Sequence, residues 1–412
     1  MTKKSDAPAI RFKGFSDAWE QRKLGDMMNV TSVKRIHQSD WTDSGVRFLR
    51  ARDIVAAAKN EEPDDYLYIS KEKYEEYSTL SGKVGVSDLL VTGVGTIGVP
   101  YLVRNLEPLY FKDGNIIWFQ NSDKIDGKFL FYSFSAEQIQ GFINESAGIG
   151  TVGTYTIESG KKTPISLPNQ IEQAKVGEFF QQLDNLITLH QRKFEKLTNV
   201  KKSMLEKMFP QNGSSYPEIR FKGFTDPWEQ RKWINTVDIS TNMVDPKSGK
   251  YDLLPHVAPG NIESFTGRLY DNVKLVGEEN LISGKFVFNV GDIVYGKINP
   301  QLGKYVFARF SGLTSADAYV LNAKNGIVQK FLYAVIQTRD FYDYSVSVSK
   351  RSGMPKINRD ELNAYSYWAP SESEQLKIGE YLLTLDHLIT LHQRELKKLQ
   401  NIKKSMLEKM FV

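Results

Sequence analysis

The segment LDNLITLHQRKFEKLTNVKKSMLEKMF at residues 183–209 recurs as LDHLITLHQRELKKLQNIKKSMLEKMF at residues 385–411. Six of the 27 aligned positions differ, so 21 are identical. Both copies show the 4-3-4-3 spacing of a helix that packs along another helix. The seam positions are Leu183, Ile187, His190, Phe194 and Leu197 in the first copy, and Leu385, Ile389, His392, Leu396 and Leu399 in the second. A glycine precedes each copy, Gly177 and Gly379, and is expected to weaken its helix.

Start and stop signals extend these helices beyond the repeated letters. Asn169 and Glu172 occupy the N-cap and N3 positions of a capping box directly after a proline. Ser371 and Glu374 repeat this signal before the second copy. Pro210 cannot continue a helix, so the first one must end at the preceding residue. The sequence therefore predicts two long, matched helices that pair antiparallel.

A second, shorter block is also duplicated. IRFKGFSDAWEQRK at residues 10–23 matches IRFKGFTDPWEQRK at residues 219–232 at 12 of 14 positions. The chain is therefore a tandem duplication of block, variable region and long helix. The predicted organisation is a tail and first block at 1–23, a variable domain at 24–167, a helix at 168–209, a linker and second block at 210–232, a variable domain at 233–369, and a helix at 370–412.

The two variable regions read as compact α/β domains. Strand-like runs occur at 88–92, 115–119, 286–290, 292–298 and 304–310, and helical runs at 128–144 and 328–345. The expected fold class is mixed α/β: two globular domains separated by a pair of long antiparallel coiled-coil helices, with pseudo-two-fold symmetry. Matched helices predict two equivalent docking surfaces, whereas the dissimilar domains predict two different recognition functions.

Composition excludes several classes of protein. The 412 residues are 41% hydrophobic with a net charge of +5, which permits a polyanionic partner. Without cysteine, the chain has no disulfide, no cysteine-ligated zinc and no thiol nucleophile. We find no signal peptide and no run of membrane-spanning length, so no membrane association and a cytoplasmic location are expected.

The motifs that would indicate an enzyme fail their context. GVGTIG (93–98) is followed by a proline where a nucleotide-binding helix should open, and GIGTVG (148–153) follows a helix rather than a strand. Asn-Pro-Gln-Leu (299–302) partly matches the N-P-P-aromatic motif of amino-methyltransferases but lacks the second proline and the aromatic residue. The five histidines have no metal-ligand spacing. We therefore expect no catalytic residue, no bound metal and no cofactor in this chain.

The duplicated blocks, the two helices and the dissimilar α/β regions between them resemble the specificity (S) subunits of type I restriction–modification enzymes. The resemblance covers essentially all of residues 10–412. It implies two target-recognition domains that each read half of a bipartite double-stranded DNA site. It also implies that the helices dock two modification subunits, which use S-adenosylmethionine to methylate adenine. Restriction subunits with ATP and Mg²⁺ would join through them for translocation and cleavage.

Because recognition domains of that family contact DNA through surface loops, the resemblance directs attention to basic and polar residues on Gly-rich loops. Among the loops that carry such residues, segments 146–155 and 345–356 lie at matching places just before the helices. The candidate DNA contacts are Arg50, Arg52, Thr96, Thr151, Thr154 and Tyr155 in the first domain, and Lys297, Asn299, Lys304, Lys350, Arg351 and Lys356 in the second.

Two alternatives use the same features. The first is a stand-alone two-domain DNA-binding regulator that dimerises through its helices. The second is a protein scaffold without DNA binding. Titrating labelled duplex DNA with and without modification subunits distinguishes all three.

Overall fold

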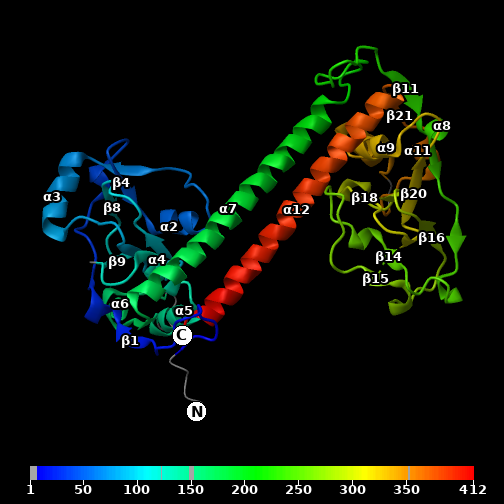
Figure 1. Ribbon diagram of the computed structural model, residues 1–412. Helices are drawn as coiled ribbons and strands as arrows, with labels where there is room; N and C mark the ends of the chain where they lie inside the picture. The colour runs from blue at the N-terminus through cyan, green and yellow to red at the C-terminus, as the bar shows by residue number, and fades with distance from the viewer. Residues whose placement is uncertain (1–6, 122, 148–152, 351–352) are drawn as a thin grey trace. The chain divides into compact units, whose positions relative to one another are not determined.

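The computed structural model describes residues 7–121, 123–147, 153–350 and 353–412 (Figure 1). The chain divides into two compact units: unit 1 is Met1–His190 with Glu395–Val412, and unit 2 is Gln191–Arg394. The two long helices, α7 (Gln170–Lys207) and α12 (Glu372–Met410), are each divided between the units. Each unit thus contains the first part of one long helix and the last part of the other.

The described residues of unit 1 form three sheets and six shorter α-helices. The first sheet has the order β2 (Asn29–Thr31), β9 (Ile116–Gln120), β6 (Leu89–Thr92), β7 (Pro100–Leu102). The second has the order β3 (Trp41–Thr42), β5 (Leu67–Ile69), β4 (Val46–Leu49), β8 (Leu109–Phe111), and β1 (Glu20–Lys23) pairs with β10 (Pro164–Leu167). The shorter helices are α1 (Leu24–Met27), α2 (Ala51–Ala58), α3 (Lys71–Ser81), α4 (Gly127–Ser133), α5 (Glu137–Ser146) and α6 (Ile157–Lys162).

Unit 2 repeats part of this plan. Its first sheet has the order β12 (Val237–Ile239), β20 (Ala318–Ala323), β17 (Ile293–Gly296), β18 (Tyr305–Phe307). The second has the order β13 (Met243–Val244), β16 (Lys285–Phe288), β19 (Gly312–Thr314), β14 (Pro255–Val257), β15 (Lys274–Leu275), and β11 (Glu229–Lys232) pairs with β21 (Ser366–Ala369). The shorter helices are α8 (Trp233–Thr236), α9 (Gln329–Ile336), α10 (Arg339–Val348) and α11 (Arg359–Asn363), and a 3₁₀ turn spans Pro300–Leu302.

The fold class predicted from the sequence is confirmed, and so are the main strands. The helices predicted at 128–144 and 328–345 are each two helices, so those single-helix predictions were wrong. In unit 2 the break falls at Gln337–Thr338, where the Thr338 hydroxyl accepts a hydrogen bond from the Phe341 N–H and caps α10. None of the helices within the described ranges is long and apolar enough to cross a bilayer.

The duplicated short block closes each unit by pairing with the strand before the long helix. In unit 1, β1 runs antiparallel to β10 with Glu20 opposite Leu167, and in unit 2, β11 runs antiparallel to β21 with Glu229 opposite Ala369. We call this arrangement, together with the long-helix segments packed on it, the repeated frame. It comprises residues 10–23, 164–184 and 403–412 in unit 1, and residues 219–232, 366–386 and 201–209 in unit 2.

The first arginine of each block is fixed by a buried glutamate on the long helix. Arg11 donates to both carboxylate oxygens of Glu172 at 2.6 and 2.7 Å, and Arg220 does the same to Glu374 at 2.7 and 2.8 Å. The Asn169 cap is confirmed, since its side chain accepts from the Glu172 N–H at 3.0 Å. The other half of the predicted capping box was wrong: these glutamates bind an arginine of the short block instead of the helix terminus. Each pair is bidentate and nearly buried, which makes it strong and geometrically specific.

The phenylalanine that follows each long helix enters an aromatic cluster of its unit. In unit 1, Phe411 lies 6.3 Å from Trp19 and 5.4 Å from Phe129, measured between ring centroids. In unit 2, Phe209 lies 5.8 Å from Trp228 and 5.6 Å from Phe331. The sequence MLEKMF is therefore repeated because each copy fills the same kind of apolar site, once in each unit.

Contacts between the two long helices also recur. In unit 1 an ion pair joins Lys403 of α12 to Asp184 of α7, and in unit 2 an ion pair joins Lys201 of α7 to Asp386 of α12. In unit 1, Lys403 meets Asp184 while the later Phe411 meets the earlier Phe180. The two helical segments therefore run antiparallel there, as predicted.

The glycines expected to weaken the helices have a packing role instead. Both helices continue through Gly177 and Gly379. A Cβ on Gly177 would lie 2.8 Å from the Lys128 Cβ, and one on Gly379 would lie 2.6 Å from the Lys330 Cβ. Glycine is therefore required where each long helix passes close to the start of α4 or α9.

We predict that Phe411→Ala loosens unit 1 and that Phe209→Ala loosens unit 2, because each removes the ring that fills one aromatic cluster. We expect a loss of about 2–4 kcal/mol for each, larger for the more buried Phe209. Hydrogen exchange is the measurement: F411A should speed exchange in β6 and β9, and F209A in β17 and β20. Each variant is the other's control, and equal acceleration in both units after either change would contradict the assignment.

Candidate nucleic-acid interface

Two predicted recognition segments meet in unit 2. The hairpin loop between β17 and β18, residues 297–303, is bonded to the segment that precedes α11. The Asn299 N–H donates to the Pro355 carbonyl at 2.8 Å, and the Ile357 N–H donates to the Lys297 carbonyl at 3.0 Å. Ile298 and Lys356 form an isolated antiparallel bridge. Segments more than 50 residues apart in sequence thus form one surface, which we call the unit 2 recognition surface.

Two cations lie over one tyrosine at this surface, and a third, Lys356, is close enough to act on the charge of Lys297. The Lys297 ammonium lies 5.2 Å and the Arg359 guanidinium 5.6 Å from the centre of the Tyr319 ring. Burial lowers the pKa of Lys297, and the positive charges of Lys356 and Arg359 lower it further, while Asp317 opposes them. Crowded positive charge of this kind attracts a polyanion.

Arg359 is the member of this group that the sequence did not identify. Its guanidinium donates to the Ile239 and Ser240 carbonyls, both at 2.8 Å, so its position is fixed. Arg359 is the first residue of α11, which begins shortly after the candidate segment 345–356. The sequence pattern did not mark Arg359 as a DNA contact, because an arginine at the start of a helix is usually exposed to solvent.

The remaining candidate residues of unit 2 differ in how accessible their side chains are to a ligand. Lys304 donates to the Ile262 carbonyl and lies 5.5 Å from the centre of the Tyr270 ring, so it is held at the base of the hairpin loop. Lys350 is exposed at the end of α10. Arg351 lies outside the described residues. Contact of these residues with DNA stays a prediction.

In unit 1 the corresponding loops also meet. The Tyr155 N–H donates to the Gly93 carbonyl at 2.9 Å, which is the counterpart of the Ile357–Lys297 bond. Thr96 is exposed in the hairpin loop between β6 and β7, and Thr154 is exposed beside it. Thr151 lies outside the described residues.

Tyr155 must be removed from the candidate contacts. It is 2% exposed, and its hydroxyl is hydrogen-bonded to Thr163 inside the core. Burial raises the pKa of this phenol well above its usual value. The sequence placed it on the loop, whereas the structure places it just after the loop, where the chain re-enters the core.

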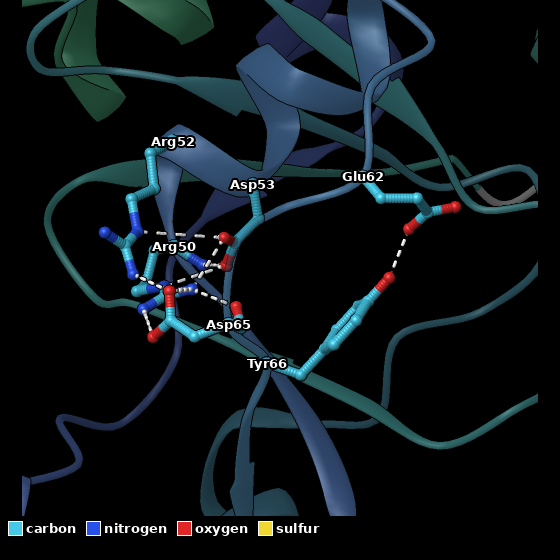
Figure 2. A network of polar contacts seen from close by, with 6 residues as sticks. All are labelled: Arg50, Arg52, Asp53, Glu62, Asp65 and Tyr66. Carbon is cyan, nitrogen blue, oxygen red and sulfur yellow. Dashed lines mark hydrogen bonds and ion pairs between the residues drawn. The ribbon is translucent and has the colours of Figure 1, made fainter. Parts of the chain in front are cut away.

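Arg50 and Arg52 are engaged with acidic residues of their own unit, as Figure 2 shows. Arg50 pairs with Asp53 and with Asp65, each at 2.9 Å, and it also donates to the Asp65 carbonyl at 2.7 Å. Arg52 pairs with the same Asp65 carboxylate. The bond from Arg50 lowers the pKa of Asp65. Two positive charges are thus balanced by two negative ones.

The two arginines differ in exposure. The Arg50 side chain is only 16% exposed, and its backbone N–H donates to Asp53 at 2.8 Å, which helps fix the start of α2. The Arg52 side chain is 60% exposed. Arg50 therefore has a structural role in this network, whereas Arg52 has a guanidinium that can still reach a ligand.

The helix seam is visible in the burial of both long helices. Leu183 and Leu385 are buried, and Leu197 and Leu399 pack against the hydrophobic cores of their units. The other predicted seam positions are buried or half-buried, namely Ile187, His190, Phe194, Ile389, His392 and Leu396. These burial classes agree with the 4-3-4-3 pattern.

Two pairs of exposed leucines beside the seam were not predicted from the sequence. Leu186 and Leu189 are 43% and 45% exposed, and their counterparts Leu388 and Leu391 are 36% and 43% exposed. They fall within the repeated letters LITL, so the same apolar surface occurs once in each unit. These four leucines fall between the predicted seam positions of the helical repeat, which agrees with their exposure.

Comparison with known proteins agrees with this arrangement. A type I restriction enzyme EcoDI specificity subunit from Escherichia coli is 30% identical over 210 residues, which is 49% of this chain and 46% of that protein. The MjaVIII specificity subunit from Methanocaldococcus jannaschii is 27% identical over 45% of this chain and 44% of that protein. The chain thus aligns with less than half the length of either relative.

A solved structure shares the fold over nearly the whole chain. The type I restriction–modification S subunit from M. genitalium has a TM-score of 0.66 and 14% sequence identity, and it covers 98% of this chain and 99% of that one. The family described as "Type I restriction modification DNA specificity domain" matches residues 16–199 and again residues 238–401. Because these two matches take in most of the sequence, the chain belongs to the type I restriction–modification DNA specificity family and carries its domain twice.

Proposed function

We propose that this chain is the specificity subunit of a type I restriction–modification system and reads an asymmetric, bipartite DNA site. The main support is a contrast within the molecule. The repeated frame is the same in both units, and so is the order of the first sheet, whereas the second sheet has four strands in unit 1 and five in unit 2. Equal frames with unequal outer parts suit two readers of different half-sites.

Charge and polarity divide the proposed contacts into two kinds. Lys297, Lys356 and Arg359 supply the positive charge that binds phosphates regardless of sequence. Polar and apolar side chains at the loop tips supply the contacts that depend on the base. The recognition surface of unit 2 combines both within two bonded segments.

The exposed leucine pairs are the proposed docking surfaces for modification subunits. Exposed apolar residues at the same place in two repeated helices fit two identical partners better than one. The partners would bring S-adenosylmethionine for adenine methylation, and restriction subunits would bring ATP and Mg²⁺. This chain would contribute recognition and assembly, with no catalysis of its own. The alternative, a regulator that dimerises through its helices, would place a second copy on the same leucines.

The decisive test exchanges one recognition domain. Replacing residues 24–163 with the corresponding segment of another family member keeps β1, β10 and both long helices, so the frame stays intact. We expect the hybrid to change one half-site and keep the other. Methylome sequencing of cells that contain the hybrid and its modification subunits provides the measurement. Simultaneous change of both half-sites would refute the modular assignment.

We predict that Lys297→Gln with Lys356→Gln weakens DNA binding similarly for all sequences. Loss of two phosphate-neutralising charges should reduce the slope of log affinity against log salt by about one to two. Fluorescence anisotropy across a salt series measures this slope. Lys196→Gln with Lys398→Gln removes two exposed charges from the long helices and is the matched control. If both double variants keep the wild-type slope, the assignment of these lysines to phosphates is wrong.

We also predict that each leucine pair supports one partner. Leu186→Ser with Leu189→Ser should lower the number of bound modification subunits from two to one, because the second pair remains. Adding Leu388→Ser with Leu391→Ser should remove the remaining subunit. Native mass spectrometry counts the subunits, and Leu106→Ser, at a position 84% exposed outside the helices, is the control. A homodimer that disappears with the same substitutions would favour the regulator instead.

A further inference from the structure

The β17–β18 hairpin loop of unit 2 has the same backbone plan as the β6–β7 loop of unit 1. The two strands meet through the Thr92 N–H to Val99 carbonyl bond at 3.1 Å in unit 1 and the Gly296 N–H to Lys304 carbonyl bond at 2.8 Å in unit 2. The third loop residue is left-handed in both, with φ of 77° at Gly95 and 51° at Asn299. Each loop also ends on a left-handed glycine, Gly98 and Gly303.

The tips of these loops differ. Between the two left-handed positions, unit 1 has Thr96 and Ile97, whereas unit 2 has Pro300, Gln301 and Leu302. Ile97 packs against the core of unit 1. In unit 2, Pro300 is buried, whereas Gln301 and Leu302 are exposed. A glutamine and a leucine therefore form the tip of the loop.

The tip is held rigidly from below. The Leu302 N–H donates to the Asn299 carbonyl and the Gly303 N–H donates to the Pro300 carbonyl, both at 2.9 Å. Phe265 packs so closely on Gly303 that a Cβ there would lie 2.5 Å from the ring. The hydrogen bond from the Asn299 N–H to the Pro355 carbonyl also restrains the backbone of this loop. An exposed apolar side chain on a rigid tip is available to a ligand.

The side chain of Asn299 orients the amide of Gln301. The Gln301 Nε2 donates to Asn299 Oδ1 at 3.3 Å. Because Gln301 is exposed, its second amide N–H and its Oε1 acceptor are available to a ligand. A neighbouring donor and acceptor on one amide match the N7 and N6 edge of adenine in the major groove, and an apolar side chain beside them matches the thymine methyl group.

We propose that the Gln301–Leu302 tip reads an A·T base pair. Gln301 Oε1 accepts from adenine N6, Gln301 Nε2 donates to adenine N7, and Leu302 contacts a thymine methyl group beside it. Asn299 is a positioning residue that fixes the glutamine amide. Lys297 and Lys304 lie at the base of the same loop, where positive charge favours DNA over an apolar protein partner. The inference rests on the proposed DNA-binding function and adds the base pair and the residues that read it.

The first experiment uses base analogues. The complex of the full chain with its modification subunits selects a consensus from randomised duplexes. Each adenine of the unit 2 half-site is then replaced by 7-deazaadenine, which lacks N7, and each thymine by uracil, which lacks the methyl group. We expect one adenine position at which 7-deazaadenine weakens binding about tenfold, in line with the loss of a bidentate contact. Gln301→Ala should remove that sensitivity, and Leu302→Ala should remove the sensitivity to uracil at one thymine.

The second experiment changes the specificity. A carboxylate accepts from cytosine N4, so Gln301→Glu should shift the preference at that position from adenine to cytosine. Asn299→Gly tolerates the left-handed backbone but removes the orienting oxygen, so it should reduce the penalty of 7-deazaadenine at the same position. Gln230→Glu and Leu253→Ala change exposed residues of unit 2 outside the loop and are the controls.

The outcomes separate this inference from the proposed function. If the wild-type complex selects no bipartite consensus, the proposed function fails. If it selects one, and the lysine variants weaken binding while Gln301→Glu and Leu302→Ala leave every position unchanged, only the assignment of the loop tip is wrong. A unit 2 half-site without an A·T pair would overturn it as well.

Discussion

The structure depends on one recurring interaction, the insertion of the phenylalanine that follows each long helix between a tryptophan of the short block and a phenylalanine of α4 or α9. Phe411 joins Trp19 and Phe129, and Phe209 joins Trp228 and Phe331. Because the ring directly follows a long helix, each cluster couples that helix to a short block, which is distant in sequence in unit 1 and near in unit 2. Buried aromatic area of this size is a major contribution to a domain core. Without this aromatic contact, neither unit could bind the end of the long helix that completes its core.

The frame tolerates variation because its contacts avoid the outer sheet. The glutamate–arginine pairs and the β1–β10 and β11–β21 pairs all lie within the repeated frame. The second sheets have hydrophobic clusters of their own, centred on residues such as Phe48 in unit 1 and Phe288 in unit 2. A change of strand number there leaves the frame contacts in place. This separation explains how two units with different outer parts keep the same base.

The repeats allowed the fold to be predicted from the sequence. The partners of individual side chains could not be predicted in this way. The two long helices and the N-cap at Asn169 could be predicted directly, because helical periodicity and capping depend on residues that are close in sequence. The partner of Glu172 could not, since Arg11 lies 161 residues away. The hairpin loops at 93–98 and 297–303 were predicted correctly as loops from their glycines, but Tyr155 was misplaced because burial depends on where the chain re-enters the core. Arg50 was taken for a ligand contact because its partner Asp65 comes from another loop.

The origin of the aromatic rings in the chain has a consequence for biosynthesis. Phe209, Trp228 and Phe331 all lie within one continuous stretch, so the cluster of unit 2 can close once that stretch has left the ribosome. Trp19 and Phe129 emerge early, but Phe411 is made only after the whole of unit 2. The nascent unit 1 therefore keeps an apolar surface open throughout the synthesis of its neighbour. Chaperone binding during translation should concentrate on this first half of the chain.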